Sequence, residues 1–98
     1  MADEMHPSAE QFLSELTIQR RASRHTLDAY RRDLFRLHRL ALEVAPSSPP
    51  DKLTTAQLRR GLMQLHAQEL APRSIARALS AWRSYYAWLA RRGTIALN

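Results

Sequence analysis

The sequence predicts a small all-α protein, a bundle of four to five amphipathic helices. Its prolines stand at positions 7, 46, 49, 50 and 72 and its two glycines lie beyond residue 60, so long stretches are free of helix breakers. Apolar residues recur in those stretches at spacings of three and four, and no segment alternates with a period of two. The 98 residues are expected to form one domain around one core, with residues 1–7 disordered.

The first helix is predicted from Ser8 to Gln19 because Ser8 and Gln11 have the spacing of a capping box. Apolar residues mark its core-facing side: Ala9, Phe12, Leu13 and Leu16.

The second helix is predicted from Ser23, an N-cap candidate, to Val44, where the proline-rich loop 45–53 ends it. An apolar stripe runs along one side: Leu27, Tyr30, Leu34, Leu37, Ala41 and Val44. Phe35 and Leu42 lie off this stripe and suggest a wider buried face. Residues with nitrogen-bearing side chains lie on the opposite side: His25, Arg32, Arg36 and Arg39. Asp28 is spaced to pair with Arg32, so salt bridges within the helix could explain part of this basic side.

The third helix is predicted from Thr54, whose spacing to Gln57 again fits a capping box, to about Glu69. Three leucines should point inward: Leu58, Leu62 and Leu65.

The fourth helix is predicted from Pro72 to Gly93, a suitable C′ residue. Its apolar stripe consists of Ile75, Leu79, Trp82, Tyr86 and Leu89, and its polar side of Arg73, Arg77, Ser80, Ser84 and Arg91. No acid follows Glu69, so this basic side has no salt-bridge partner on its own helix. Trp88 lies off the stripe, either as a boundary aromatic or facing another domain, another subunit or DNA.

The charge distribution points to a polyanionic partner. The net charge is +6, but four of the nine acids precede Arg20, so fifteen bases face five acids from there onward. Fourteen of these bases are arginine, whose planar fork matches phosphate and guanine acceptors. The alternative is that the arginine excess only reflects a GC-rich genome.

No catalytic or metal-binding arrangement stands out. Cysteine is absent, and the four histidines lack metal-ligand spacing and are expected at the surface or its boundary: His6, His25, His38 and His66. Tyr85 and Tyr86 are better explained by core packing than as nucleophiles. No cofactor is predicted. Neither a secretory signal nor an apolar run of ~20 residues occurs, so we expect a cytoplasmic protein without a membrane segment.

Two segments, SRHTLDAYRRDL from Ser23 to Leu34 and RSIARALSAWRSYYAWL from Arg73 to Leu89, carry a family resemblance. With FLSEL at Phe12 and the ending ARRGTIALN, they resemble the N-terminal core-binding (SAM-like) domain of Xer-type tyrosine recombinases, slightly closer to XerC than to XerD. Three positions depart from the family pattern: Ala22, Ala78 and Trp82.

The resemblance implies a domain that grips one face of a double-stranded recombination half-site, while a separate catalytic domain, absent here, cleaves the strand. It further implies a role in chromosome dimer resolution and segregation, a heterotetramer with a partner recombinase, and help from a DNA translocase. On the second helix it assigns DNA contacts to Ser23, Thr26, Tyr30, Arg32 and Arg36, and on the fourth helix to Arg73, Ser74, Arg77 and Arg83.

Arg77 is the first choice for a groove contact, and Arg77→Ala is predicted to weaken binding without unfolding the protein. For Ser23, N-capping is the alternative, and for Tyr30, core packing. Two other readings of the whole chain remain: the same domain in a phage or mobile-element integrase, and a small helical adaptor that binds an acidic protein.

Overall fold

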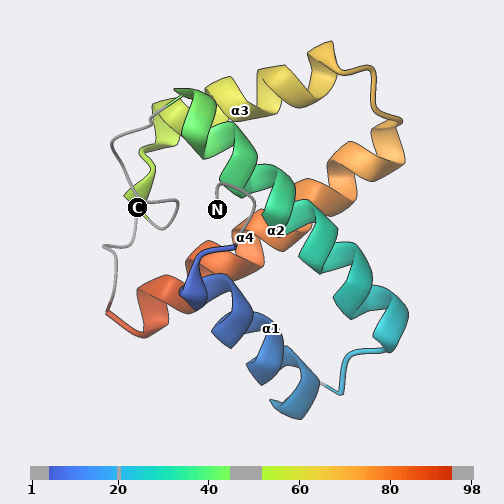
Figure 1. Ribbon diagram of the computed structural model, residues 1–98, viewed down its shortest axis with the longest axis vertical. Coiled ribbons are helices and arrows are strands. Elements are labelled where there is room, and N and C mark those ends of the chain that lie inside the picture. Colours follow the sequence, from blue (N-terminus) through green and yellow to red (C-terminus); the bar gives the residue numbers. More distant parts are fainter. Residues whose placement is uncertain (1–4, 20, 45–51, 94–98) are drawn as a thin grey trace.

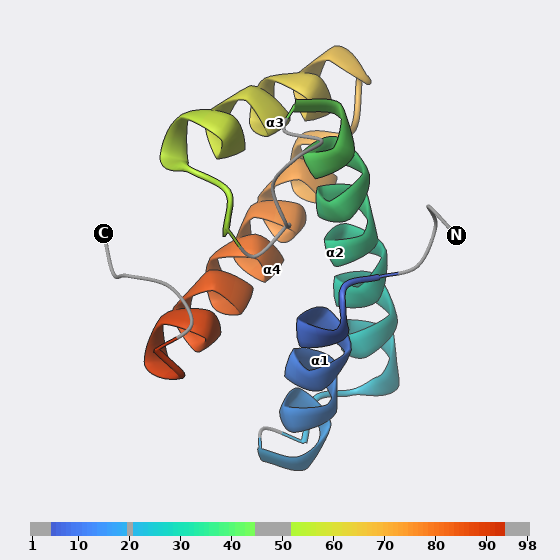
Figure 2. The same cartoon turned by 60° about the vertical axis from the view of Figure 1, so that its left-hand side comes forward.

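Two long helices cross near the middle of the molecule, and two shorter helices pack below and above the crossing (Figure 1). The computed structural model describes residues 5–19, 21–44 and 52–93. These contain four helices, α1 (Pro7–Gln19), α2 (Arg24–Val44), α3 (Thr55–Ala67) and α4 (Pro72–Arg91), and no strand. α2 packs on α4 at the crossing, α1 lies against α2, and α3 runs across the upper end of α2 (Figure 2). The predicted all-α fold is confirmed.

Side-chain caps define two of the four helix starts as predicted. The amide of Thr26 donates to the Ser23 hydroxyl at 3.1 Å, so Ser23 caps α2. Thr54 and Gln57 form both bonds of a capping box, at 3.2 and 2.9 Å. Caps of this kind satisfy backbone amides that lack a partner in the first turn of a helix.

The capping role predicted for Ser8 at the start of α1 was wrong, although the limits of the helix are close to those expected. The amide of Ser8 donates to the imidazole Nδ1 of His6 at 3.2 Å, and the helix begins at Pro7, one residue earlier than expected. The Ser8 hydroxyl instead bonds the hydroxyl of Tyr85 on α4, at 2.5 Å. Of the segment expected to be disordered, residues 1–4 lie outside the described ranges, whereas Met5 packs against the core.

The core of α1 follows the predicted stripe, but the buried side of α4 is rotated from it. Leu79 and Tyr86 are only partly buried, while Tyr85 is fully buried and Trp88 is 6% exposed. The reason is that α4 packs against α1 as well as α2, and the Phe12 ring lies 5.8 Å from Tyr85 and 5.7 Å from Trp88. Trp88 is therefore a core residue, and not the boundary or partner-facing aromatic that the sequence predicted. Core packing of Tyr85 is confirmed.

Three further expectations about α2 need correction. His38 was placed at the surface or boundary, yet it is buried and bonds the Leu34 carbonyl oxygen at 2.7 Å. Leu42 was expected to widen the buried face, yet it is 50% exposed. Asp28 and Arg32 form no ion pair in the described part of the chain. The side chain of Val44 lies outside the described residues.

A search of the described residues finds no helix long and apolar enough to cross a bilayer. The same residues bring no three His, Cys, Asp or Glu side chains together in a way that could hold a metal ion.

Candidate nucleic-acid interface

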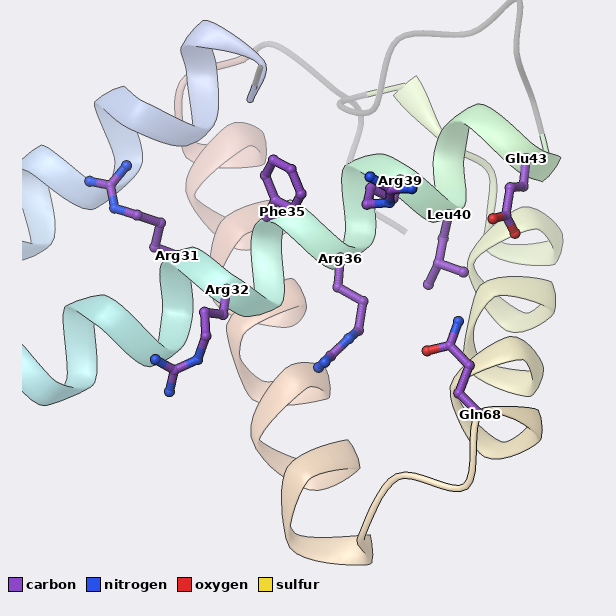
Figure 3. A pocket seen from close by; sticks show the side chains of 8 residues that line it. All are labelled: Arg31, Arg32, Phe35, Arg36, Arg39, Leu40, Glu43 and Gln68. Carbon is purple, nitrogen blue, oxygen red and sulfur yellow. The ribbon is translucent and has the colours of Figure 1, made fainter. Parts of the chain in front are cut away.

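The N-terminal halves of α2 and α4 diverge from the crossing (Figure 1), and both carry arginines. Arg32 and Arg36 stand one turn apart on α2, and Arg73 and Arg77 stand one turn apart on α4. Figure 3 shows the Arg36 side chain extending from α2 toward α4. The two basic stripes, more than thirty residues apart in the sequence, thus lie on helices that pack against each other.

A hollow of about 550 Å³ lies along α2 beside this opening (Figure 3). Gln68, just after α3, closes one end of it, and the apolar side chains of Phe35 and Leu40 form part of its wall. Charged residues supply the remaining lining: Arg31, Arg32, Arg36, Arg39 and Glu43. Four arginines and one acid line the hollow, and two of these arginines also approach acids outside it, Arg31 at Glu10 and Arg36 at Asp33.

An ion pair joins the two crossing helices. Asp33 of α2 has no exposed side-chain surface, and its carboxylate accepts from Nε of Arg77 at 2.8 Å and from Nη2 at 3.1 Å. Arg36 approaches the same carboxylate at 3.7 Å. One buried negative charge therefore holds two of the predicted DNA-binding arginines close together.

Hydrogen bonds from the guanidinium to Asp33 raise the pKa of Arg77 above its ordinary value, against the opposing effect of burial, and the charge of Asp33 adds to the increase. Arg77 thus stays charged at any physiological pH. The side chain as a whole remains 36% exposed.

The hydroxyl-bearing candidates lie toward the start of α2. Ser23 and Thr26 are exposed, and their hydroxyls bond each other at 3.0 Å as part of the helix cap. N-capping and a phosphate contact are compatible for Ser23, because a hydroxyl that serves as a cap can also bond an anion. Tyr30 packs against the core and is only partly exposed, which supports the packing explanation for its ring.

The remaining candidates on α4 differ in position. Arg73 is exposed and, within the described ranges, forms no ion pair. Ser74 is half-buried. Arg83 is exposed but projects about 120° around the helix from Arg77, which places it outside the arginine cluster.

Sequence reasoning missed Asp33, the residue that organises the cluster. The available signal was its place at the edge of the apolar stripe of α2, where an acid is buried only if it is paired. Sequence reasoning also left out two arginines that join α1 to its neighbours. Arg31 bonds both carboxylate oxygens of Glu10 at 2.7 Å, and Arg92 bonds Glu15 at 3.3 Å while its guanidinium lies 4.6 Å from the Trp88 ring centre.

Comparison with known sequences places this helical arrangement in a family. Residues 9–93 match the family described as phage integrase, N-terminal SAM-like domain. The chain belongs to this family. The two motifs that carry the resemblance form α2 and α4 of the SAM-like domain, and the predicted kinship with Xer-type tyrosine recombinases is confirmed.

Curated relatives of this SAM-like domain carry the name tyrosine recombinase XerC. The protein of Xanthomonas campestris pv. campestris (strain B100) is 47% identical over 97 residues, covering 99% of this chain and 30% of the relative. Those of Ralstonia pickettii (strain 12J) and Pseudomonas aeruginosa (strain LESB58) are 42% and 44% identical, over 89% and 91% of this chain and 26% and 29% of the relatives. The chain thus spans less than a third of the relatives' length. No solved structure matches it.

Proposed function

We propose that this domain binds double-stranded DNA and holds one face of a recombination half-site. The observation that carries the proposal is the meeting of Arg36 of α2 and Arg77 of α4 at the carboxylate of Asp33, with Arg32 and Arg73 one turn earlier on the same helices. Arginines that are at least partly exposed on two diverging helices can offer charge on both sides of a phosphate backbone. Most protein–DNA hydrogen bonds go to that backbone, and arginine is a preferred donor.

The length of α2 suits a contact that extends across a groove. Ser23 and Arg36 are thirteen positions apart, which corresponds to about 20 Å along a helix. A major groove is about 12 Å wide, so one end of α2 can reach a phosphate while its middle lies over the bases. The first turn of α2 supplies backbone amides for that phosphate, next to the hydroxyls of Ser23 and Thr26.

For the parent protein we propose the role that the relatives' name indicates, a site-specific tyrosine recombinase of the XerC kind. Another part of that protein then cleaves the strand, and this domain holds the duplex and fixes the position of the protein along it. We propose that the parent protein acts in the cytoplasm. There it would resolve chromosome dimers together with a partner recombinase and with the help of a DNA translocase. An integrase of a phage or mobile element is the second candidate, since the matched family takes its description from phage integrases.

The test is fluorescence anisotropy with a labelled duplex, the corresponding single strand and an acidic peptide, each titrated with the chain at several salt concentrations. We expect duplex binding that weakens steeply with salt, because each neutralised phosphate contributes a slope of about 0.9. The double variant Arg32→Gln/Arg73→Gln should bind at least ten-fold more weakly at moderate salt, since two charge-assisted phosphate contacts are lost.

Arg59→Gln/Arg60→Gln is the matched control. It removes the same charge from the exposed side of α3 and should leave duplex affinity nearly unchanged. An equal loss of duplex affinity in both double variants would show that the chain binds DNA through its net charge alone and would contradict the proposed site. Saturable binding of the acidic peptide with no duplex binding would favour the adaptor interpretation instead.

A further inference from the structure

The stability of the fold does not explain why the carboxylate of Asp33 is buried. Burying a charge costs several kcal/mol even when it is paired, and apolar replacements of buried ion pairs are often as stable as the original pair. Asp33 nevertheless stands with no exposed surface on the side of α2 that faces α4. The indole Nε1 of Trp82 donates to the backbone oxygen of Asp33 at 2.9 Å, which fixes this turn of α2 against α4. The carboxylate is thus held in a defined place.

The geometry of the pair leaves one edge of the Arg77 guanidinium available. A guanidinium carries five N–H donors in one plane. Asp33 takes the edge formed by Nε and Nη2, and the other edge, formed by Nη1 and Nη2, is not used by any residue within the described part of the chain. With the side chain 36% exposed, that edge can meet an acceptor outside the protein. Because Asp33 fixes the plane of the guanidinium, the direction of the free edge is set before a ligand binds.

Two acceptors in a duplex fit such an edge, a phosphate and the O6 and N7 atoms of guanine in the major groove. The buried carboxylate favours guanine for two reasons. It offsets the charge of Arg77, which weakens long-range attraction to phosphates. It also fixes the orientation of the fork, which discrimination between bases requires and phosphate attraction does not. Arg73, exposed and without an ion pair in the described ranges, has the opposite properties and suits a phosphate.

We propose that Asp33 is a positioning residue that holds Arg77 as the reader of a guanine in the recombination half-site. The inference rests on the proposed DNA-binding function and assigns base recognition to one residue of the cluster. Arg77 touches the base, and Asp33 acts only through Arg77. Arg36 of α2 also approaches the carboxylate of Asp33, at 3.7 Å.

The experiment is selection of duplexes from a randomised pool by the 98-residue chain, followed by sequencing and affinity measurement on the selected site. The wild-type chain should enrich guanine at one position, and replacing that base should weaken binding by roughly five- to a hundredfold. Arg77→Lys keeps the charge but loses the fork, so it should abolish the preference at that position and keep the others. Asp33→Asn should weaken the same preference, because it releases the guanidinium.

Arg59→Lys is the matched control, since it makes the same chemical change at an exposed position of α3, outside the proposed DNA contacts. It should leave every base preference unchanged. Circular dichroism establishes that each variant is folded, and Asp33→Glu, which keeps the charge but displaces it, replaces Asp33→Asn if that variant unfolds. It should weaken the guanine preference in the same way.

The possible failures can be told apart. A wild-type chain that binds no duplex at low salt refutes the proposed function and this inference with it. A chain that binds duplexes while Arg77→Lys keeps every preference, or weakens binding to all sequences equally, refutes the inference alone. A folded Asp33 variant with the full guanine preference shows that Asp33 does not position Arg77.

Discussion

The hydroxyls of Ser8 and Tyr85 lie 2.5 Å apart and tie the first turn of α1 to the middle of α4. They are separated by 77 positions in the sequence, and Tyr85 has no exposed surface. His6 extends the contact, because its Nδ1 lies 2.7 Å from the Ser8 hydroxyl. This polar contact, which no sequence pattern predicts, fixes the N-terminal segment to the core.

Tyr85→Phe removes this contact while leaving the ring in place. We expect a loss of about 1 kcal/mol in the free energy of unfolding, the typical net value of one hydrogen bond. Urea denaturation of Tyr85→Phe, Ser8→Ala and the double variant measures it. The double variant should lose less than the sum of the two single variants, and strict additivity would show that the two hydroxyls do not stabilise each other.

Arg77→Ala is expected to destabilise the protein by about 3 kcal/mol. The variant leaves Asp33 buried without its principal partner, and loss of one member of a buried pair costs about 3–5 kcal/mol, with the lower end applying because Arg77 is partly exposed. The sequence alone predicted that this variant would stay folded, and the buried carboxylate changes that expectation. Thermal unfolding should place Arg73→Ala, at an exposed position, within about 0.5 kcal/mol of the wild type. Similar stability of the two variants would show that the pair contributes little.

Gly61→Ala is expected to stabilise the protein by about 0.5–1 kcal/mol. Gly61 lies inside α3, where alanine is the better helix former by roughly that amount. A Cβ at this position would lie 3.6 Å from Cδ1 of Leu40, an ordinary van der Waals distance, so no neighbour has to move. Urea denaturation measures the change, and a lower unfolding midpoint would mean that α2 and α3 pack more tightly than this distance indicates.

Arg32→Gln is expected to lower the salt dependence of duplex binding. If Arg32 neutralises one phosphate, the slope of log affinity against log salt should fall by about 0.9. Anisotropy titrations between low and moderate salt give the slope directly. Arg59→Gln on α3 should keep the wild-type slope, and an unchanged slope for Arg32→Gln would remove Arg32 from the DNA contacts.

Local features of the fold could be predicted because they depend on residues close together in the sequence. Capping side chains act within three positions, as Ser23 and Thr54 show, and an amphipathic stripe repeats within one helix, as in α1. The capping prediction failed at Ser8, where a partner from α4 takes the hydroxyl. The prediction for Trp88 failed because its burial depends on Phe12 of another helix.

By itself, the sequence determined the approximate limits of the helices, the arginine-rich character of α2 and α4, and the family. Only the tertiary structure decided which arginines meet, because the crossing of α2 and α4 brings Asp33 to Arg77 across 44 positions. A pattern along one helix shows which residues share a side of that helix, but not which side of another helix they meet. That pairing depends on the crossing, which the packing of all four helices fixes together.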